Sequence, residues 1–146
     1  MYFRLLEVYN YYVMEERMFK FSAIFNGFSV DDIPKAKEFY QTLLGVEIGD
    51  ESMGLQLLWP GGGETFIYEK KDHVPASFTI LNFVVDDINS AIDELVSLGV
   101  EFERYDDMPA PQDERGILRG LAANEGPDIA WFKDPAGNIL AVLQDK

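Results

Sequence analysis

The sequence predicts an α+β fold of two βαβββ modules, and three observations support this prediction. Residues 28–33 (FSVDDI) reappear as residues 83–88 (FVVDDI). In each copy an apolar segment leads through two aspartates into apolar residues at helical spacing. The 146 residues suit one domain of about 100–200 residues, and two copies are too few for a solenoid, which needs about three. The two halves are therefore expected to bury each other.

Module one begins with an apolar strand that leads into a helix. Asp32 is predicted to cap this helix, because an aspartate accepts hydrogen bonds from the free N–H groups of a first turn. Pro34 fits that turn, where its missing N–H costs little, and Gly45 is predicted to end the helix. Segments rich in Phe, Ile, Val and Leu predict strands at 23–30, 46–48, 55–59 and 65–69.

Module two repeats this order. Asp87 is the predicted helix cap and Gly99 the predicted helix end. Glycine-rich residues 61–63 and the segment 134–138 (DPAGN) predict turns between strands in the two modules. Strands of module two are predicted at 78–85, 101–105, 129–133 and 139–144.

The repeat also predicts the domain organisation. Residues 1–17 are rich in tyrosine and precede the first strand, so we interpret them as an N-terminal extension. A single domain is predicted over residues 18–146. Module one then covers residues 18–70, and module two covers residues 77–146.

One long connection interrupts module two. Residues 106–128 are rich in Pro, Gly and acidic side chains, and connections longer than about 12–15 residues are usually functional or mobile. We interpret this segment as a flap over the site, with a short ordered piece at 116–119. An arginine of this segment, Arg115 or Arg119, could pair with a ligand carboxylate, and Glu114 could act as a general base. The alternative is a charged loop that faces solvent.

Composition excludes several classes of function. The chain carries 12 Lys and Arg against 26 Asp and Glu, a formal net charge of −14. This balance argues against nucleic acid as a partner, since phosphates require clustered basic residues, and against anionic membrane surfaces. With no cysteine there is no disulfide, thiolate nucleophile or Cys-ligated zinc. A cytoplasmic location is therefore predicted, and no apolar run reaches the roughly 18 residues of a membrane helix.

Several motifs in order resemble the vicinal oxygen chelate superfamily, which includes glyoxalase I, extradiol dioxygenases and bleomycin-resistance proteins. They are residues 30–40 (VDDIPKAKEFY), 43–46 (LLGV), 82–88 (NFVVDDI) and 131–140 (WFKDPAGNIL). The resemblance covers roughly residues 20–145. It implies two βαβββ modules that form a curved mixed sheet around a cup-shaped site, and it implies a homodimer.

The resemblance also implies where a metal would bind. Metal-dependent members place His or Gln, then Glu, His and Glu, on the first and last strands of each module. The matching positions here are Phe25, Tyr68 (or Glu69 if the register slips by one), Ile80 and Ala141. Phe, Ile and Ala offer no lone pair to a divalent cation. We therefore predict a metal-free site without a cofactor.

Strand alternation extends this set to a predicted pocket. Side chains two residues apart share a face, so Ser29 is expected beside Phe25, and Asn82 and Val84 beside Ile80. Asn82 either orients a ligand or satisfies neighbouring backbone, and the two tryptophans either stack on a ligand or belong to the core. The predicted ligand pocket is Phe25, Ser29, Trp59, Tyr68, Ile80, Asn82, Trp131 and Ala141.

His73 is the only histidine in the chain. With Glu69 and Asp72 it could form a metal-binding or acid–base cluster, and a Ser–His–acid triad could be built only on this residue. No nucleophile elbow accompanies it. We favour the alternative, a solvated linker between the modules beside Pro75.

These observations predict a metal-free protein that binds, and sequesters, a hydrophobic or aromatic small molecule as a homodimer. The second hypothesis is an enzyme of the lyase, isomerase or dioxygenase-like kind. It would be cofactor-independent or use a non-standard metal site drawn from Glu69, His73 and Glu114. A third hypothesis, a purely structural interaction protein, predicts no enclosed pocket. No nucleic-acid or membrane partner is expected.

Overall fold

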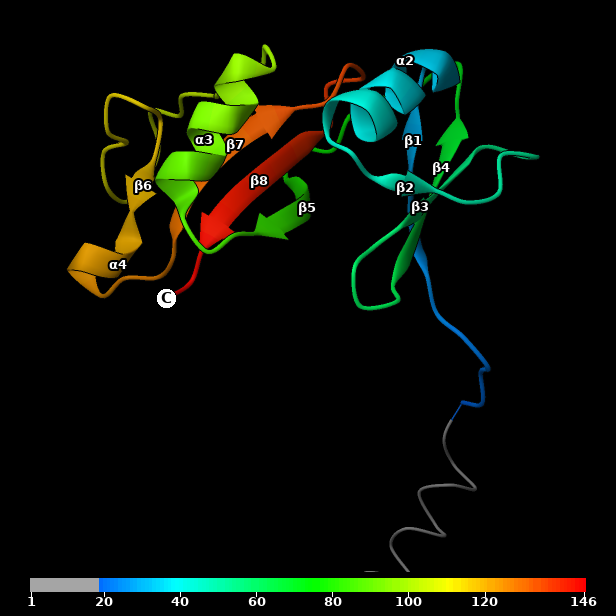
Figure 1. Cartoon of the computed structure of the whole chain (residues 1–146), viewed down its shortest axis with the longest axis horizontal. Coiled ribbons are helices and arrows are strands. Elements are labelled where there is room, and N and C mark those ends of the chain that lie inside the picture. Colours follow the sequence, from blue (N-terminus) through cyan, green and yellow to red (C-terminus); the bar gives the residue numbers. More distant parts are fainter. Residues whose placement is uncertain (1–18) are drawn as a thin grey trace, which may run out of the picture.

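The protein forms two four-stranded sheets, one from each half of the chain (Figure 1). The structure is a computed structural model that describes residues 19–146, so the predicted extension over residues 1–17 lies outside the described residues. The first half contains β1 (Asn26–Val30), α2 (Ile33–Lys37), the π-helical η1 (Glu38–Leu43), β2 (Glu47–Ile48), β3 (Leu55–Leu58) and β4 (Glu64–Glu69). The second half contains β5 (Thr79–Val84), α3 (Ile88–Ser97), β6 (Leu118–Arg119), α4 (Gly120–Ala123), β7 (Asp128–Lys133) and β8 (Ile139–Gln144).

Both sheets have the same connectivity. The strand orders are β1-β4-β3-β2 and β5-β8-β7-β6. In each sheet the first strand of the module runs parallel to the last, and the other neighbours are antiparallel. A parallel pair needs a long crossover, which the helix and the two middle strands provide. This confirms the predicted fold class, with each module forming its own mixed sheet.

The helix boundaries follow the predicted caps. The carboxylate of Asp32 accepts a hydrogen bond from the N–H of Lys35 at 2.9 Å, and Asp87 accepts from Asn89 at 2.9 Å. Gly45 and Gly99 follow the helices with positive φ angles of 72° and 91°, which glycine adopts without a steric penalty. Among the described helices, none has both the length and the apolar character needed to cross a bilayer.

One hydrophobic core joins the two modules on the helix-covered faces of the sheets. Phe39 of η1 packs against Phe132 of β7, with ring centroids 6.5 Å apart. Trp59, just after β3, packs edge-on against Phe83 of β5 at 5.9 Å. Aromatic side chains of this size dominate the stability of a small core. The halves therefore bury each other, as the repeat predicted.

A buried polar cluster also joins the modules. The Tyr40 hydroxyl of η1 donates to the Asp134 carboxylate at 2.8 Å. That carboxylate also accepts from the N–H groups of Ala136 and Asn138 and from the Asn138 amide, each at 2.9 Å. Burial raises the pKa of Tyr40 well above its ordinary value, and the nearby Asp134 charge adds to the effect. The predicted turn at 134–138 is thus the polar joint between the halves.

The strand predicted at 101–105 is wrong. Only an isolated bridge between Phe102 and Phe132 forms there, and β6 pairs with the edge of β7 instead. The Gln112 side chain bonds backbone groups that a strand would use. It accepts from the N–H of Tyr105 and donates to the carbonyl of Glu103. Such side-chain bonds compete with a sheet ladder. The strand β6 (Leu118–Arg119) lies within the ordered piece predicted at 116–119.

The segment interpreted as a flap is attached to the outer helix. Arg115 donates to the Asn89 carbonyl at 3.1 Å and pairs with Asp93, both on α3. Arg119 pairs with Asp113 at 3.0 Å and with Asp128. Both guanidinium groups are therefore engaged within module two, and the loop is anchored on the helix side of the second sheet.

Candidate functional site

Strand alternation gives each sheet a helix-covered face and an open face. On β4, Thr65 and Ile67 are buried beneath the helices, whereas Phe66 and Tyr68 point to the other side. The register sets Gly27 of β1 beside Phe66, and Ser29 beside Tyr68. A Cβ at position 27 would lie 2.8 Å from the Phe66 carbonyl oxygen, so glycine permits this close approach. We call this side the open face of the first sheet.

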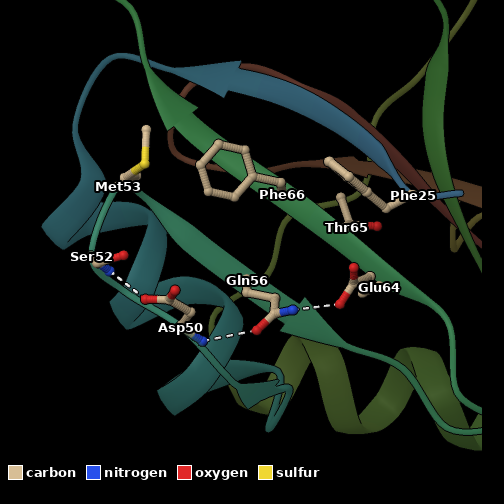
Figure 2. A pocket seen from close by; sticks show the side chains of 8 residues that line it. All are labelled: Phe25, Asp50, Ser52, Met53, Gln56, Glu64, Thr65 and Phe66. Atoms are coloured by element: carbon tan, nitrogen blue, oxygen red, sulfur yellow. Dashed lines mark hydrogen bonds between the residues drawn. The ribbon is translucent and has the colours of Figure 1, made fainter. Parts of the chain in front are cut away.

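A cavity of about 270 Å³ lies on this open face (Figure 2). Its apolar wall consists of Phe25, Phe66 and Met53, and its opposite side is polar. Phe25 is 61% exposed and Met53 is 84% exposed, although both are apolar. Exposed apolar side chains gathered in a hollow mark a binding surface. The full lining is Phe25, Asp50, Ser52, Met53, Gln56, Glu64, Thr65 and Phe66.

The polar side of this cavity is held in place by a chain of hydrogen bonds, which Figure 2 shows as dashed lines. The N–H of Asp50 donates to the Gln56 side-chain oxygen at 2.9 Å, and the Gln56 amide donates to the Glu64 carboxylate. Hydrogen bonds from Ser52 lower the pKa of Asp50. Among the described residues no Lys or Arg forms an ion pair with Asp50 or Glu64. The cavity therefore combines an aromatic wall with fixed negative charge.

A second cavity of about 430 Å³ lies between the modules. It brings together three residues of the predicted pocket, Ser29, Tyr68 and Ile80. His73 also lines it: this residue lies in the mostly exposed connection between the modules, and its ring is half-buried. The ring lies 2.7 Å from the Ser29 hydroxyl and 3.0 Å from the Ala136 carbonyl. The linker is held by one contact to each module.

Three other predicted residues lie on the second sheet. Asn82, Ala141 and Trp131 are neighbours across β5, β8 and β7 and share one face. The Trp131 ring donates to the Thr79 hydroxyl at 3.1 Å and packs edge-on against Tyr105 at 5.7 Å. Asn82 is exposed, and Ala141 is fully buried. The structure therefore groups these three residues away from Phe25.

Two further predicted positions are Ile80 and Trp59. The β5–β8 register shifts between Thr79 and Leu81, which leaves Ile80 without a partner on β8, and Ile80 lines the cavity between the modules. Trp59 donates to the Thr65 hydroxyl at 2.8 Å and packs in the core, which matches the alternative interpretation for this tryptophan.

The four positions matched to family metal ligands do not form one donor set. Tyr68 and Ile80 line the cavity between the modules, Phe25 lines the other cavity, and Ala141 is buried in the second sheet. Across residues 19–146, no three His, Asp or Glu side chains are close enough to hold a metal ion. Three of the four side chains offer no lone pair, so they do not fit the metal of the family pattern.

Sequence reasoning missed most of the first cavity. Phe66 and Glu64 follow from Tyr68 by the same two-residue alternation that linked Phe25 to Ser29, so that signal was present. Gln56 required the β3–β4 register, in which it pairs with Phe66. Asp50 and Met53 lie in the connection before β3, and their position depends on the tertiary fold.

A known protein family and solved structures resemble this chain. Residues 24–142 match the family model described as Glyoxalase/Bleomycin resistance protein/Dioxygenase superfamily. No curated protein matches the chain significantly. Many solved structures are similar to this chain, among them the following three.

The first is TnmS3, an antibiotic binding protein from Streptomyces sp. CB03234, with a TM-score of 0.58 and 22% identity over 88% of this chain and 100% of that one. A superfamily member from Sphaerobacter thermophilus has a TM-score of 0.58 and 22% identity, over 85% and 98%. A glyoxalase/bleomycin resistance protein/dioxygenase from Nocardioides has a TM-score of 0.61 and 16% identity, over 94% and 93%. At these identities the likeness shows the fold.

Proposed function

We propose that this chain, which belongs to the glyoxalase/bleomycin resistance protein/dioxygenase superfamily, binds and sequesters a hydrophobic or aromatic small molecule without a metal ion. The binding site of this proposal is the cavity on the open face of the first sheet. The observation that carries the proposal is the pairing of exposed Phe25 and Met53 with a fixed Gln56–Glu64 hydrogen bond. Ligand sites are typically apolar hollows with a few fixed polar groups.

The two sides of the cavity define the kind of ligand. Phe25 and Phe66 offer flat apolar surfaces against which an aromatic ring can stack. At the opposite side Glu64 accepts one hydrogen bond from Gln56, and a carboxylate can accept several. An aromatic compound with an amine or another donor at one end satisfies both sides.

The similarity to TnmS3 supports sequestration as the mode of action, because that protein is described as an antibiotic binding protein. The likeness is one of fold, so the ligand of the present chain follows from its own cavity. Of the side chains of this cavity only Phe25 matches a position of the family metal site, and it offers no lone pair to a metal. They suit binding by apolar contact and hydrogen bonding.

The proposal includes a homodimer in the cytoplasm. Both open faces carry exposed apolar side chains, with Tyr68 42% exposed in module one and Val84 65% exposed in module two. A second copy laid on these open faces would remove this surface from water and close the cavity, which is the physical support for a dimer. The lack of cysteine supports a reducing compartment.

A ligand screen by thermal shift, followed by calorimetric titration of the hits, tests the proposal. We expect aromatic compounds to raise the melting temperature, and Phe66→Ala to weaken their binding by about tenfold, as loss of one aromatic contact implies. Val96→Ala, an exposed change on the outside of α3, is the matched control with unchanged affinity. Equal affinity in Phe66→Ala and wild type would refute this site, and stoichiometric metal in the purified protein would refute metal-free binding.

A further inference from the structure

We propose that Ser29 and His73 form a nucleophile–base pair in the cavity between the modules, which accepts the acyl group of an activated ester. This inference goes beyond the binding function and concerns a different cavity. It rests on the Ser29 hydroxyl oxygen lying 2.7 Å from the His73 Nδ1 and on the 3.0 Å contact from the His73 Nε2 to the Ala136 carbonyl. The arrangement has the order nucleophile, base and orienting group.

The hydrogen-bond partners of the ring fix its proton. A backbone carbonyl only accepts, so the Nε2 of His73 must carry the hydrogen that it shares with Ala136. In a neutral imidazole the Nδ1 then has no hydrogen and accepts one from the Ser29 hydroxyl. This is the tautomer that a base needs in order to take a proton from serine. A carbonyl here has the orienting role that a carboxylate has in other triads.

Three separate parts of the chain hold this pair. Ser29 belongs to β1, its carbonyl accepts from the Asn138 amide at 3.1 Å, and that amide also donates to Asp134. His73 belongs to the connection between β4 and β5, where its N–H donates to the Lys70 carbonyl at 3.0 Å. A catalytic pair needs such support from groups outside it.

The cavity offers a substrate position beside the pair. Both side chains line a space of about 430 Å³, together with the apolar Phe78 and Ile80. Tyr68 is the register partner of Ser29 on β4 and lies on the same face. Its side chain lines the same cavity, so we assign to its phenol the role of donor to the oxyanion that forms on the acyl group. The apolar lining fits a short aliphatic or aromatic acyl chain.

The proposed reaction is ester hydrolysis in two steps. The Ser29 oxygen attacks the ester carbon and forms the acyl–oxygen bond, its proton passes to the His73 Nδ1, and the ester C–O bond breaks. The departing alkoxide or phenoxide takes that proton from His73 and leaves as an alcohol or phenol. Water then attacks the acyl group with His73 as base, which releases the carboxylic acid and restores Ser29.

The first test uses the unmodified full chain with p-nitrophenyl acetate and a fluorophosphonate probe. We expect release of nitrophenol above the buffer rate, and one adduct that peptide mapping assigns to Ser29. Ser29→Ala should abolish both, and Ser77→Ala, an exposed serine in the same connection, should change neither. Absence of a Ser29 adduct on the wild-type chain at saturating probe would overturn the proposal, because that result depends on no variant.

The second test separates a base from a structural histidine. His73→Gln should slow adduct formation on the order of 10²-fold or more, and Tyr68→Phe by about 10²-fold. Because the chain has no cysteine, Ser29→Cys places a single thiol at this position. Its alkylation by iodoacetamide should have a pH midpoint below the usual thiol pKa of about 8.5, and His73→Gln should move the midpoint upward. An identical pH profile with and without His73 would also overturn the proposal.

Discussion

The helices of the two modules start from the same sequence motif but are built differently. The segment from Asp32 to Gly45 is one residue longer than the segment from Asp87 to Gly99. Module two forms the continuous α-helix α3, whereas module one passes from α2 into the π-helical η1. There the N–H of Leu44 reaches back five residues to the Phe39 carbonyl at 2.9 Å. A π turn takes up one extra residue without moving the helix ends.

The open faces of the two sheets also differ, although the sheets have the same connectivity. In module one the face carries Glu64 and Phe66 beside a cavity. In module two the matching region of β7 and β8 carries Trp131 beside a buried Ala141, and Tyr105 covers Trp131. The Tyr105 hydroxyl is buried with no hydrogen-bond partner among residues 19–146, and burial raises its pKa. A duplicated backbone thus supports two different surfaces, since the side chains of the open face are free of the core.

The largest effect on stability is expected at the polar joint. Module two provides this joint with its turn at 134–138, whereas the glycine turn of module one does not provide one. Asp134→Ala removes the acceptor of four hydrogen bonds in a residue that is 4% exposed. We expect a loss of about 3–5 kcal/mol in the free energy of unfolding, measured by urea titration. Asp106→Ala, an exposed carboxylate, should stay within about 0.5 kcal/mol of wild type. Similar values for the two variants would show that the polar joint contributes no more to stability than an exposed carboxylate does.

The module-one side of that joint should show a pH dependence. Tyr40→Phe removes the hydroxyl that donates to Asp134, at a cost of about 2 kcal/mol at neutral pH. The pKa of Tyr40 is raised in the fold, so above the ordinary value of 10.0 the unfolded chain loses this proton before the folded chain does. Its contribution is therefore complete below pH 10.0 and falls as the pH rises further. Denaturant titrations between pH 7 and pH 11 should show a shallower decline in Tyr40→Phe than in wild type.

The two helix caps offer a matched pair of changes. Asp87 accepts from the N–H groups of Asn89 and Ser90 and from the Ser90 hydroxyl, whereas within residues 19–146 Asp32 accepts one hydrogen bond, from the Lys35 N–H. We expect Asp87→Ala to lower the melting temperature more than Asp32→Ala.

Acid should remove the Asp87 effect. Hydrogen bonds from Ser90 lower the pKa of Asp87 below 3.8. Its contribution is therefore present above that pH and is lost as the pH falls through the lowered value. Melting curves at pH 7 and at pH 2 check both statements, and equal melting temperatures of the two variants at pH 7 would contradict the unequal caps.

The smallest effect on stability is expected at the open face of module one. Glu64→Gln keeps the size of the side chain and the contact to Gln56 but removes the charge. Unfolding should be nearly unchanged, while the affinity for a positively charged aromatic probe should fall by about 3–10-fold. A neutral probe of the same shape is the control, and its Kd should not change. An equal loss for both probes would show that Glu64 acts through shape alone.

Much of the fold could be predicted because it depends on neighbours in the chain. The caps at Asp32 and Asp87, the turn at 134–138 and seven of the eight strands follow local rules of hydrogen bonding and side-chain alternation. The strand expected at 101–105 failed because Gln112, seven residues beyond Tyr105, takes the backbone bonds. The register shift that leaves Ile80 unpaired could not be predicted because it depends on the partner strand β8.

The sequence by itself determined that the chain has two βαβββ modules and that Phe25, Ile80 and Ala141 offer no metal ligand, because repeat pattern and side-chain chemistry need no knowledge of distant contacts. Only the tertiary structure decided that Asp50 and Met53 join Phe66 around a cavity, that Tyr40 joins Asp134, and that His73 meets Ser29. These residues lie far apart in the chain or on different strands. Their contacts arise from sheet register and from the packing of one module on the other, neither of which local sequence specifies.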